Sequence, residues 1–264
     1  MPLTQKETSL IISTYSWPEA LELCLNSVTK QRKKPHEVIV ADDGSREKTK
    51  RVIDSYKDQL NIVHVWHEDK GFRLAEIRNK AIKKATGKYI IQIDGDIILD
   101  KNFIKDHISF AKKGFHTRGT RVKISKKLSK KLLNGEKINL HFFTSGLETR
   151  ENAIRFKVLT LLLSKPKLQS SKALGCNMAF WRSDLLKING YDNNLKGWGH
   201  EDEELCARLI NISILRRKIK YNAIAYHIYH VERNKELEHE HNNMINSVRD
   251  NLIIRTENGI DELS

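Results

Sequence analysis

Apolar and polar positions alternate along the first hundred residues in a pattern typical of an α/β protein. Four short runs are rich in Ile and Val, at residues 9–15, 37–41, 61–66 and 88–93. Such continuous apolar runs are typical of parallel strands that are buried on both faces. Between them, residues 18–28, 48–56 and 74–85 place apolar side chains at helical spacing. The pattern predicts a βαβαβαβ half of a doubly wound, mostly parallel sheet.

The second half of the chain is less regular. Residues 112–172 contain the basic cluster 126–131 and one apolar stretch at 154–163, and we interpret them as an excursion and flexible loop. Regular structure is predicted again from residue 175. We expect a strand at 176–181, a short helix from Ser183, a helix at about 200–211, a strand at 221–227 and a charged surface helix within 232–254.

The charge balance indicates an anionic partner. The chain of 264 residues carries 47 Lys and Arg against 33 Asp and Glu, a net charge of +14. Nucleic acid, an anionic membrane surface and a diphosphate-bearing acceptor are all attracted by such a field, and charge does not choose among them. The three cysteines are far apart, and the run 158–163 is far short of a membrane span. We therefore expect a cytoplasmic protein, with charge alone allowing peripheral contact at the inner face of the membrane.

Acidic side chains follow two of the predicted strands. Asp94, Gly95 and Asp96 come after the run 88–93, and Asp42 and Asp43 end the run that starts at residue 37. Ligands bind beyond the carboxyl ends of strands in open α/β sheets, and paired carboxylates suit a hard divalent cation. The alternatives are an Asp-Gly turn at 94–95 and helix capping by Asp43 or Ser45.

Together with residues 13–15, 41–45, 71 and 78–79, the Asp94-Gly95-Asp96 motif resembles the ordered pattern of family 2 glycosyltransferases. The resemblance implies a GT-A type fold, which combines a Rossmann-like nucleotide-binding half with an acceptor-side half. It places Asp94 and Gly95 at the nucleotide and Asp96 at a metal. The uridine end would be held by Thr14, Tyr15, Asp42, Asp43 and Arg78. Ser16 and Trp17 depart from the Asn-Arg of many members.

A second motif, residues 197–202 with the sequence GWGHED, resembles the acceptor-side motif of β-1,4-galactosyltransferases and bacterial chondroitin-type polymerases. A glycine-rich backbone lets Trp198 lie against a sugar face, and Glu201 and Asp202 open a helix whose dipole favours acids. The purely structural alternative is an ordinary acidic helix start with Trp198 in the core. The resemblance makes Asp202 the catalytic base of an inverting enzyme, and Trp198, Gly199 and Glu201 contacts to donor or acceptor sugar.

Two histidines follow that motif in the string YHIYH. His227 and His230 could converge on one metal as neutral imidazoles, together with Asp96. In galactosyltransferases, metal ligands with the same spacing follow the acidic motif, so the resemblance implies Mn²⁺ or Mg²⁺ here. Residues 175–182 also follow that family segment. Asn177 would donate a hydrogen bond to substrate, whereas Met178 and Phe180 would pack beneath the site.

The resemblances predict a metal-dependent inverting glycosyltransferase. It would move a hexose or N-acetylhexosamine from a UDP-sugar to a hydroxyl of a glycan or lipid-linked acceptor, in bacterial surface polysaccharide synthesis. One GT-A domain would comprise a UDP-binding half (about 1–100), a variable excursion (101–172), a donor-sugar and acceptor half (173–231) and a charged helix (232–264). The alternatives are a nucleotidyltransferase, for which a glycine-rich phosphate loop is missing, and a basic nucleic-acid-binding protein using the Lys clusters 126–131 and 215–220. We do not expect a nucleic acid partner.

Overall fold

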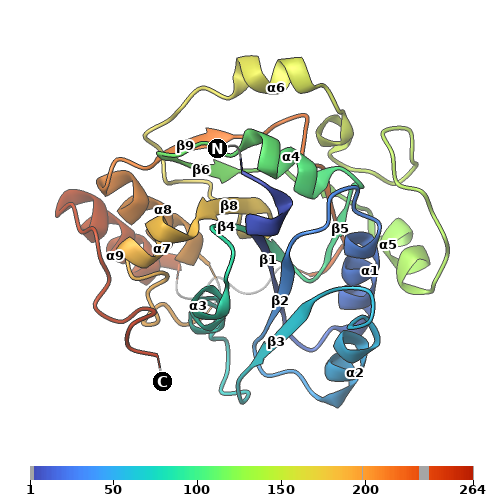
Figure 1. Cartoon of the computed structure of the whole chain (residues 1–264), viewed down its shortest axis with the longest axis horizontal. Helices are drawn as coiled ribbons and strands as arrows, with labels where there is room; N and C mark the ends of the chain where they lie inside the picture. Colours follow the sequence, from blue (N-terminus) through green and yellow to red (C-terminus); the bar gives the residue numbers. More distant parts are fainter. Residues whose placement is uncertain (1–2, 198, 232–237, 264) are drawn as a thin grey trace.

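A seven-stranded mixed sheet forms the centre of the protein (Figure 1). The computed structural model describes residues 3–197, 199–231 and 238–263. The strand order is β3-β2-β1-β4-β8-β6-β9. The strands are β1 (Thr8–Thr14), β2 (Glu37–Asp42), β3 (Ile62–Trp66), β4 (Tyr89–Asp94), β6 (Phe115–Arg118), β8 (Met178–Trp181) and β9 (Leu215–Lys218).

The first four strands agree with the apolar runs of the sequence and are all parallel. They alternate with α1 (Pro18–Thr29), α2 (Glu47–Ser55) and α3 (Leu74–Lys84). Pro18 opens α1, where its missing N–H costs nothing because the first amides of a helix have no intrahelical acceptor. The predicted βαβαβαβ half is therefore confirmed.

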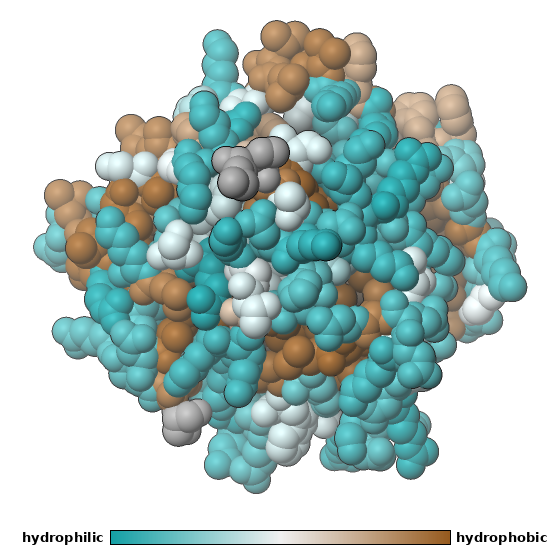
Figure 2. All heavy atoms as spheres, in the orientation of Figure 1, coloured by the Kyte–Doolittle hydropathy of each residue, from teal (hydrophilic) through white to brown (hydrophobic). Residues whose placement is uncertain are grey.

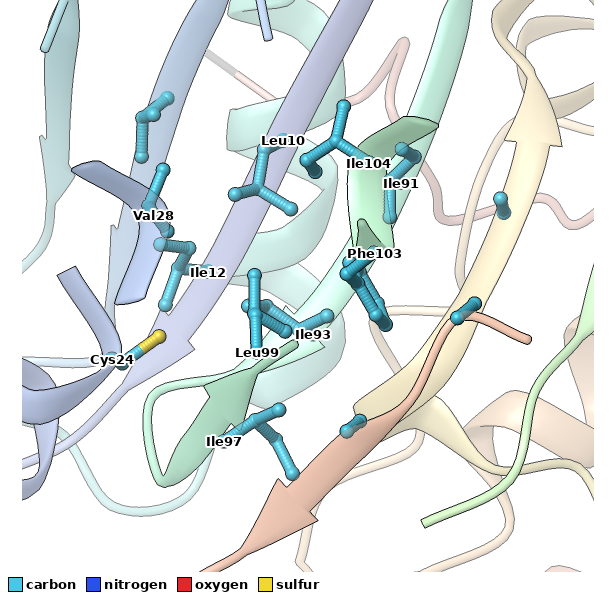
Figure 3. Packing of buried hydrophobic residues seen from close by; sticks show 14 of the residues in the cluster. Leu10, Ile12, Cys24, Val28, Ile91, Ile93, Ile97, Leu99, Phe103 and Ile104 are labelled. Carbon is cyan, nitrogen blue, oxygen red and sulfur yellow. The ribbon is translucent and has the colours of Figure 1, made fainter. Parts of the chain in front are cut away.

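Helices cover both faces of this sheet, as expected for strands that are apolar throughout. Leu10 and Ile12 of β1 point to the face covered by α1 and by α4 (Phe103–Phe110), where they pack near Cys24 and Phe103 (Figure 3). Ile11 points to the opposite face, which α3, α7 (Arg182–Lys187) and α8 (Glu201–Asn211) cover. The alternation of side chains along a strand thus fills two separate cores.

The segment 112–172, interpreted as an excursion and flexible loop, contains regular structure that this prediction missed. It includes β6, β7 (Val122–Lys123), α5 (Lys126–Leu133) and α6 (Lys157–Leu163). β6 is only four residues long, and three of the four are polar. It is held by antiparallel pairing with β8 and parallel pairing with β9, a distant strand that the sequence pattern also did not reveal.

A second, three-stranded sheet lies beside the carboxyl end of β4. Its order is β5-β10-β7, with β5 (Ile97–Leu99) antiparallel to β10 (Ala225–His227). In this register His227 is opposite Ile97, and the Ile228 amide donates to the Asp96 carbonyl. The small sheet therefore brings the histidines of the YHIYH string to the acids that follow β4.

The charged tail forms α9 (Glu238–Asp250), which packs on α8 and has Ile245 and Val248 among its buried side chains. None of the helices in the ranges described above has the length and apolar character needed to cross a bilayer.

Candidate active site

Three parallel strands end side by side at one edge of the large sheet and carry the predicted nucleotide-binding residues. Thr14 of β1 is in register with Asp42 of β2, and Ser13 is in register with Asp94 of β4. The Gly95 amide donates to the Ser13 carbonyl at 2.7 Å, so the turn after β4 packs directly on β1. The structure therefore brings Thr14, Asp42, Asp94 and Gly95 to one edge, as the strand-end argument predicted.

The acids after β2 are more enclosed than the sequence suggested. Asp42 accepts from the Ser45 amide at 2.8 Å and lies 3.0 Å from His64 Nε2. Asp43 Oδ1 lies 2.6 Å from His67 Nε2. Neither Asp43 nor Ser45 caps α2, because Arg46 occupies the N-cap position without a side-chain cap. Tyr15 is part-exposed, and its hydroxyl donates to Asp69.

Asp96, His227 and His230 form a compact cluster of oxygen and nitrogen ligands. Asp96 Oδ2 lies 3.5 Å from His227 Nε2 and 3.3 Å from His230 Nε2, and one ligand atom of each residue lies within 4.8 Å of the others. The second carboxylate oxygen, Asp96 Oδ1, is buried and has no hydrogen-bond partner among the residues that the structure describes. A buried, unpartnered carboxylate oxygen beside two imidazoles fits a divalent cation such as Mn²⁺.

The electrostatics of the cluster agree with this fit. Burial and the neighbouring Asp94 carboxylate raise the pKa of Asp96 to about 8. Burial, with Arg121 nearby, lowers the pKa of His227 to about 3, so the imidazole is neutral and can donate a lone pair to a metal. Asp96 and His227 are therefore poorly suited to form an ion pair with each other. A bound cation would offset the free-energy cost of burying the Asp96 carboxylate.

Arg78 of α3 joins the two halves of the site. Its side chain is 1% exposed. Nη2 lies 3.1 Å from Asp94 Oδ1, and Nη1 lies 3.1 Å from Glu201 Oε1 and 3.2 Å from Asp202 Oδ1. The guanidinium is thus shared among three carboxylates, and the contact of Arg78 with the uridine end stays a prediction.

The Asp202 carboxylate is held through one of its two oxygens. Arg78, Tyr191 and Gln92 approach Oδ1 at 3.2, 3.0 and 3.4 Å. In the described ranges every hydrogen bond to this carboxylate ends on Oδ1. Oδ2 lies against Gly175, where a Cβ atom would come within 2.2 Å of it. Because Gly175 has no side chain, Asp202 Oδ2 can occupy this position. The sequence pattern did not indicate this role of Gly175.

Glu201 and Asp202 stand at the start of α8. Four consecutive acids fill the first turn, where the helix dipole favours negative charge. Gly197, Gly199 and His200 all have positive φ angles, so the glycines let the chain turn sharply into the helix. Burial and the charge of Asp202 raise the pKa of Glu201 to about 7. Trp198, predicted to contact a sugar, lies outside the described residues.

A cavity of about 310 Å³ opens beside these acids. Its walls include Arg78, Asp94, Gly199, Glu201 and Asp202, so residues from the predicted nucleotide and sugar sides face one space. Arg121 also lines it, with Nη1 4.0 Å from Cys176 Sγ. Sequence reasoning missed Arg121 because it lies in the segment interpreted as a loop, and a single arginine there carries no distinguishing pattern.

Asn177 requires a correction. The side chain is fully buried, and Nδ2 donates to the carbonyls of Thr120 and Ala223 at 2.8 and 3.1 Å. Its Oδ1 lies 2.9 Å from His107 Nε2. Both N–H groups of the Asn177 side chain therefore donate to carbonyls of the protein. Asn177 holds neighbouring segments together and is not placed to donate to a substrate. Met178 and Phe180 are buried in the core beneath it, as predicted.

Two protein families match the chain. The model of glycosyl transferase family 2 matches residues 9–174, and the model of the N-terminal domain of galactosyltransferase matches residues 158–231. The first match covers more than half of the chain, which therefore belongs to glycosyl transferase family 2. The second covers the segment that contains Asp202, His227 and His230.

The chain is similar to several curated sugar transferases. It is 26% identical to validoxylamine A glucosyltransferase of Streptomyces hygroscopicus subsp. limoneus, over 76% of this chain and 47% of that protein. It is also 26% identical to chondroitin synthase of Escherichia coli, over 83% of this chain and 34% of that protein. The chain thus spans half or less of the length of these relatives.

Solved structures define the fold. A crystal structure of S. aureus TarS residues 1–349 superposes with a TM-score of 0.63 at 17% identity, covering 97% of this chain and 68% of that one. Mannosyltransferase PcManGT from Pyrobaculum calidifontis, in complex with GDP-Man and Mn²⁺, gives a TM-score of 0.57 at 15% identity, covering 84% and 56%. The mostly parallel large sheet with helices on both faces is the GT-A fold, as predicted.

Proposed function

We propose that this protein is a UDP-sugar-dependent, inverting glycosyltransferase whose catalytic base is Asp202. The observation that carries the proposal is the geometry of that carboxylate. Three donors fix Oδ1, while Oδ2 lies beside Gly175. Asp202 itself lines the cavity. A general base needs this combination of a fixed orientation and a free oxygen.

The reaction is a single displacement. An acceptor hydroxyl attacks the anomeric carbon of the donor sugar, the bond from that carbon to the diphosphate oxygen breaks, and the configuration inverts. Asp202 takes the hydroxyl proton as the new bond forms. Arg78 keeps the Asp202 carboxylate oriented, and Glu201 binds hydroxyl groups of a sugar.

Asp96, His227 and His230 would hold a divalent cation, Mn²⁺ or Mg²⁺. When bound there, the cation would neutralise charge on the leaving diphosphate. Arg121 supplies a second positive charge at the wall of the cavity. We place the nucleotide at the edge formed by β2, β1 and β4, where Thr14, Tyr15, Asp42, Asp43, Asp94 and Gly95 would bind it, and we place Gly199 beside the sugar.

Complexes of similar proteins support the donor class. Structures of S. aureus TarS contain UDP and UDP-GlcNAc, and its curated name is poly(ribitol-phosphate) beta-N-acetylglucosaminyltransferase. We extend this to a hexose or N-acetylhexosamine donor and to a glycan or lipid-linked glycan acceptor in bacterial surface polysaccharide synthesis.

A donor panel tests the proposal. Release of UDP or GDP from UDP-glucose, UDP-galactose, their N-acetylated forms and GDP-mannose is measured with Mn²⁺, alongside thermal stabilisation by UDP and GDP. We expect hydrolysis or transfer from a UDP-sugar and stabilisation by UDP. Activity confined to GDP-mannose, or no response to any nucleotide, would overturn the proposed donor class.

A further inference from the structure

Helix α6 carries its apolar and polar residues in the reverse of the usual arrangement. Val158, Leu161, Leu162 and Leu163 are 61, 60, 66 and 52% exposed, whereas the polar Thr160 is 1% exposed. Thr160 Oγ1 donates to the Lys220 carbonyl at 2.6 Å and accepts from Asn222 Nδ2 at 2.8 Å. The helix is therefore fixed to the body of the protein by its polar residue, and its apolar side chains face outward.

The outward apolar side chains form one continuous protrusion. Figure 1 places α6 at the top of the molecule, away from the central sheet, and Figure 2 shows hydrophobic atoms gathered at that position. Phe156, directly before the helix, is 54% exposed, and Leu168 after it is 78% exposed. A contiguous exposed apolar surface of this kind marks a site of interaction with an apolar partner.

The charge around α6 indicates which partner. The chain has no Asp or Glu from residue 152 to residue 183, whereas that segment contains six Lys and Arg residues. None of the salt bridges in the described part of the chain uses Lys157, Lys165 or Lys167. Leucines surrounded by unpaired lysines are suited to a bilayer interface with anionic lipid headgroups, where the leucines enter the acyl boundary and the lysines meet phosphates.

A small cavity at the base of α6 adds to this surface. It encloses about 90 Å³, and Lys105, Lys157 and Leu161 are among the residues that line it. Arg155 and Asp106 also line it and form an ion pair with each other. Lys105 and Lys157 therefore remain to meet a phosphate beside the exposed leucines.

We propose that α6 and its flanking lysines dock the protein on an anionic membrane surface by shallow insertion. This assigns membrane contact to a specific apolar helix, whereas the net charge alone did not indicate which part of the chain would make it. Docking on a membrane does not require sugar transfer. The proposal can therefore be tested independently of the proposed transferase activity.

Vesicle sedimentation of the purified full chain tests the proposal. We expect binding to vesicles of phosphatidylcholine with phosphatidylglycerol, little binding to phosphatidylcholine alone, and weakening in high salt. Leu161→Glu with Leu162→Glu should lower the partition coefficient by at least about tenfold. The matched control is Phe143→Glu with Leu252→Glu, which changes two residues that are 78 and 68% exposed elsewhere and should bind more tightly than the α6 variant.

Three results would overturn docking through α6. One is a wild-type chain that stays in the supernatant with phosphatidylglycerol vesicles. Another is equal binding by the α6 variant and its charge-matched control, which would leave only non-specific charge attraction. The third is an α6 variant whose sedimentation velocity without lipid changes from oligomer to monomer, which would assign the helix to contact with a second copy.

Discussion

The guanidinium of Arg78 lies 3.2 Å from Oδ1 of Asp202, across 124 positions of the sequence. The same guanidinium contacts Asp94 and Glu201, so one buried cation links the end of β4 to the start of α8. The nucleotide side and the sugar side of the site are therefore coupled through a single side chain.

Replacing this cation should destabilise the fold. Arg78→Met would leave three carboxylates around an uncharged side chain, and we expect a loss of about 3–5 kcal/mol in the free energy of unfolding, measured in urea. Arg51→Met is the control, because its ion pair with Glu47 is exposed and should contribute less than about 1 kcal/mol. Equal midpoints for Arg78→Met and wild type would show that the network does not hold the two halves together.

The clearance at Gly175 should be essential for turnover. In Gly175→Ala the new Cβ would fall 2.2 Å from Asp202 Oδ2 and 2.9 Å from Arg78 Nη2, so the carboxylate must move. We expect kcat to fall by at least about tenfold. Gly135→Ala is the control. Its φ of +86° makes the substitution strained, but apart from its chain neighbours no atom of the described residues lies within 4 Å of the added Cβ. That variant should lose some stability and keep its kcat, and a Gly175→Ala enzyme as active as wild type would argue against our placement of Oδ2.

Metal binding should depend on the Asp96 cluster. Asp96→Asn and His230→Ala should each weaken Mn²⁺ binding by at least about tenfold in an EPR titration, because each removes one ligand. Dialysis against a chelator should abolish transfer, and Mn²⁺ or Mg²⁺ should restore it. His141→Ala removes an exposed histidine elsewhere and should bind Mn²⁺ like wild type. Unchanged Mn²⁺ affinity in both cluster variants would place the metal at another position.

Replacing Asn177 should lower the free energy of unfolding without weakening donor binding. Asn177→Ala leaves the Thr120 and Ala223 carbonyls and His107 without their partner, and we expect a loss of about 3 kcal/mol in urea unfolding. The KM for the donor should stay within about twofold in the folded fraction. Asn246→Ala on the exposed side of α9 is the control. A stable Asn177→Ala variant with a raised donor KM would restore the original prediction of substrate contact.

The strand ends were predictable because parallel strands with continuous apolar runs place the acids that follow them at one edge. Asp94 and Asp42 are found there for that reason. Resemblance to known motifs added Asp96, His227 and His230, which the structure brings together. The contacts of Arg78 and the clearance at Gly175 depend on how α3 and α8 pack, and no local pattern records that packing. Short strands such as β6 and β9 were missed because pairing with distant strands, more than their own residues, determines them.

The central claim is that Asp202 takes a proton from the acceptor. Its most direct test compares kcat and UDP affinity for wild type and Asp202→Asn, with Asp54→Asn, an exposed acid on α2, as the control. We predict that Asp202→Asn lowers kcat about 10²- to 10⁴-fold and leaves the calorimetric Kd for UDP with Mn²⁺ nearly unchanged, because the amide keeps the shape but cannot accept the proton. An Asp202→Asn enzyme with the turnover of wild type would contradict the assignment.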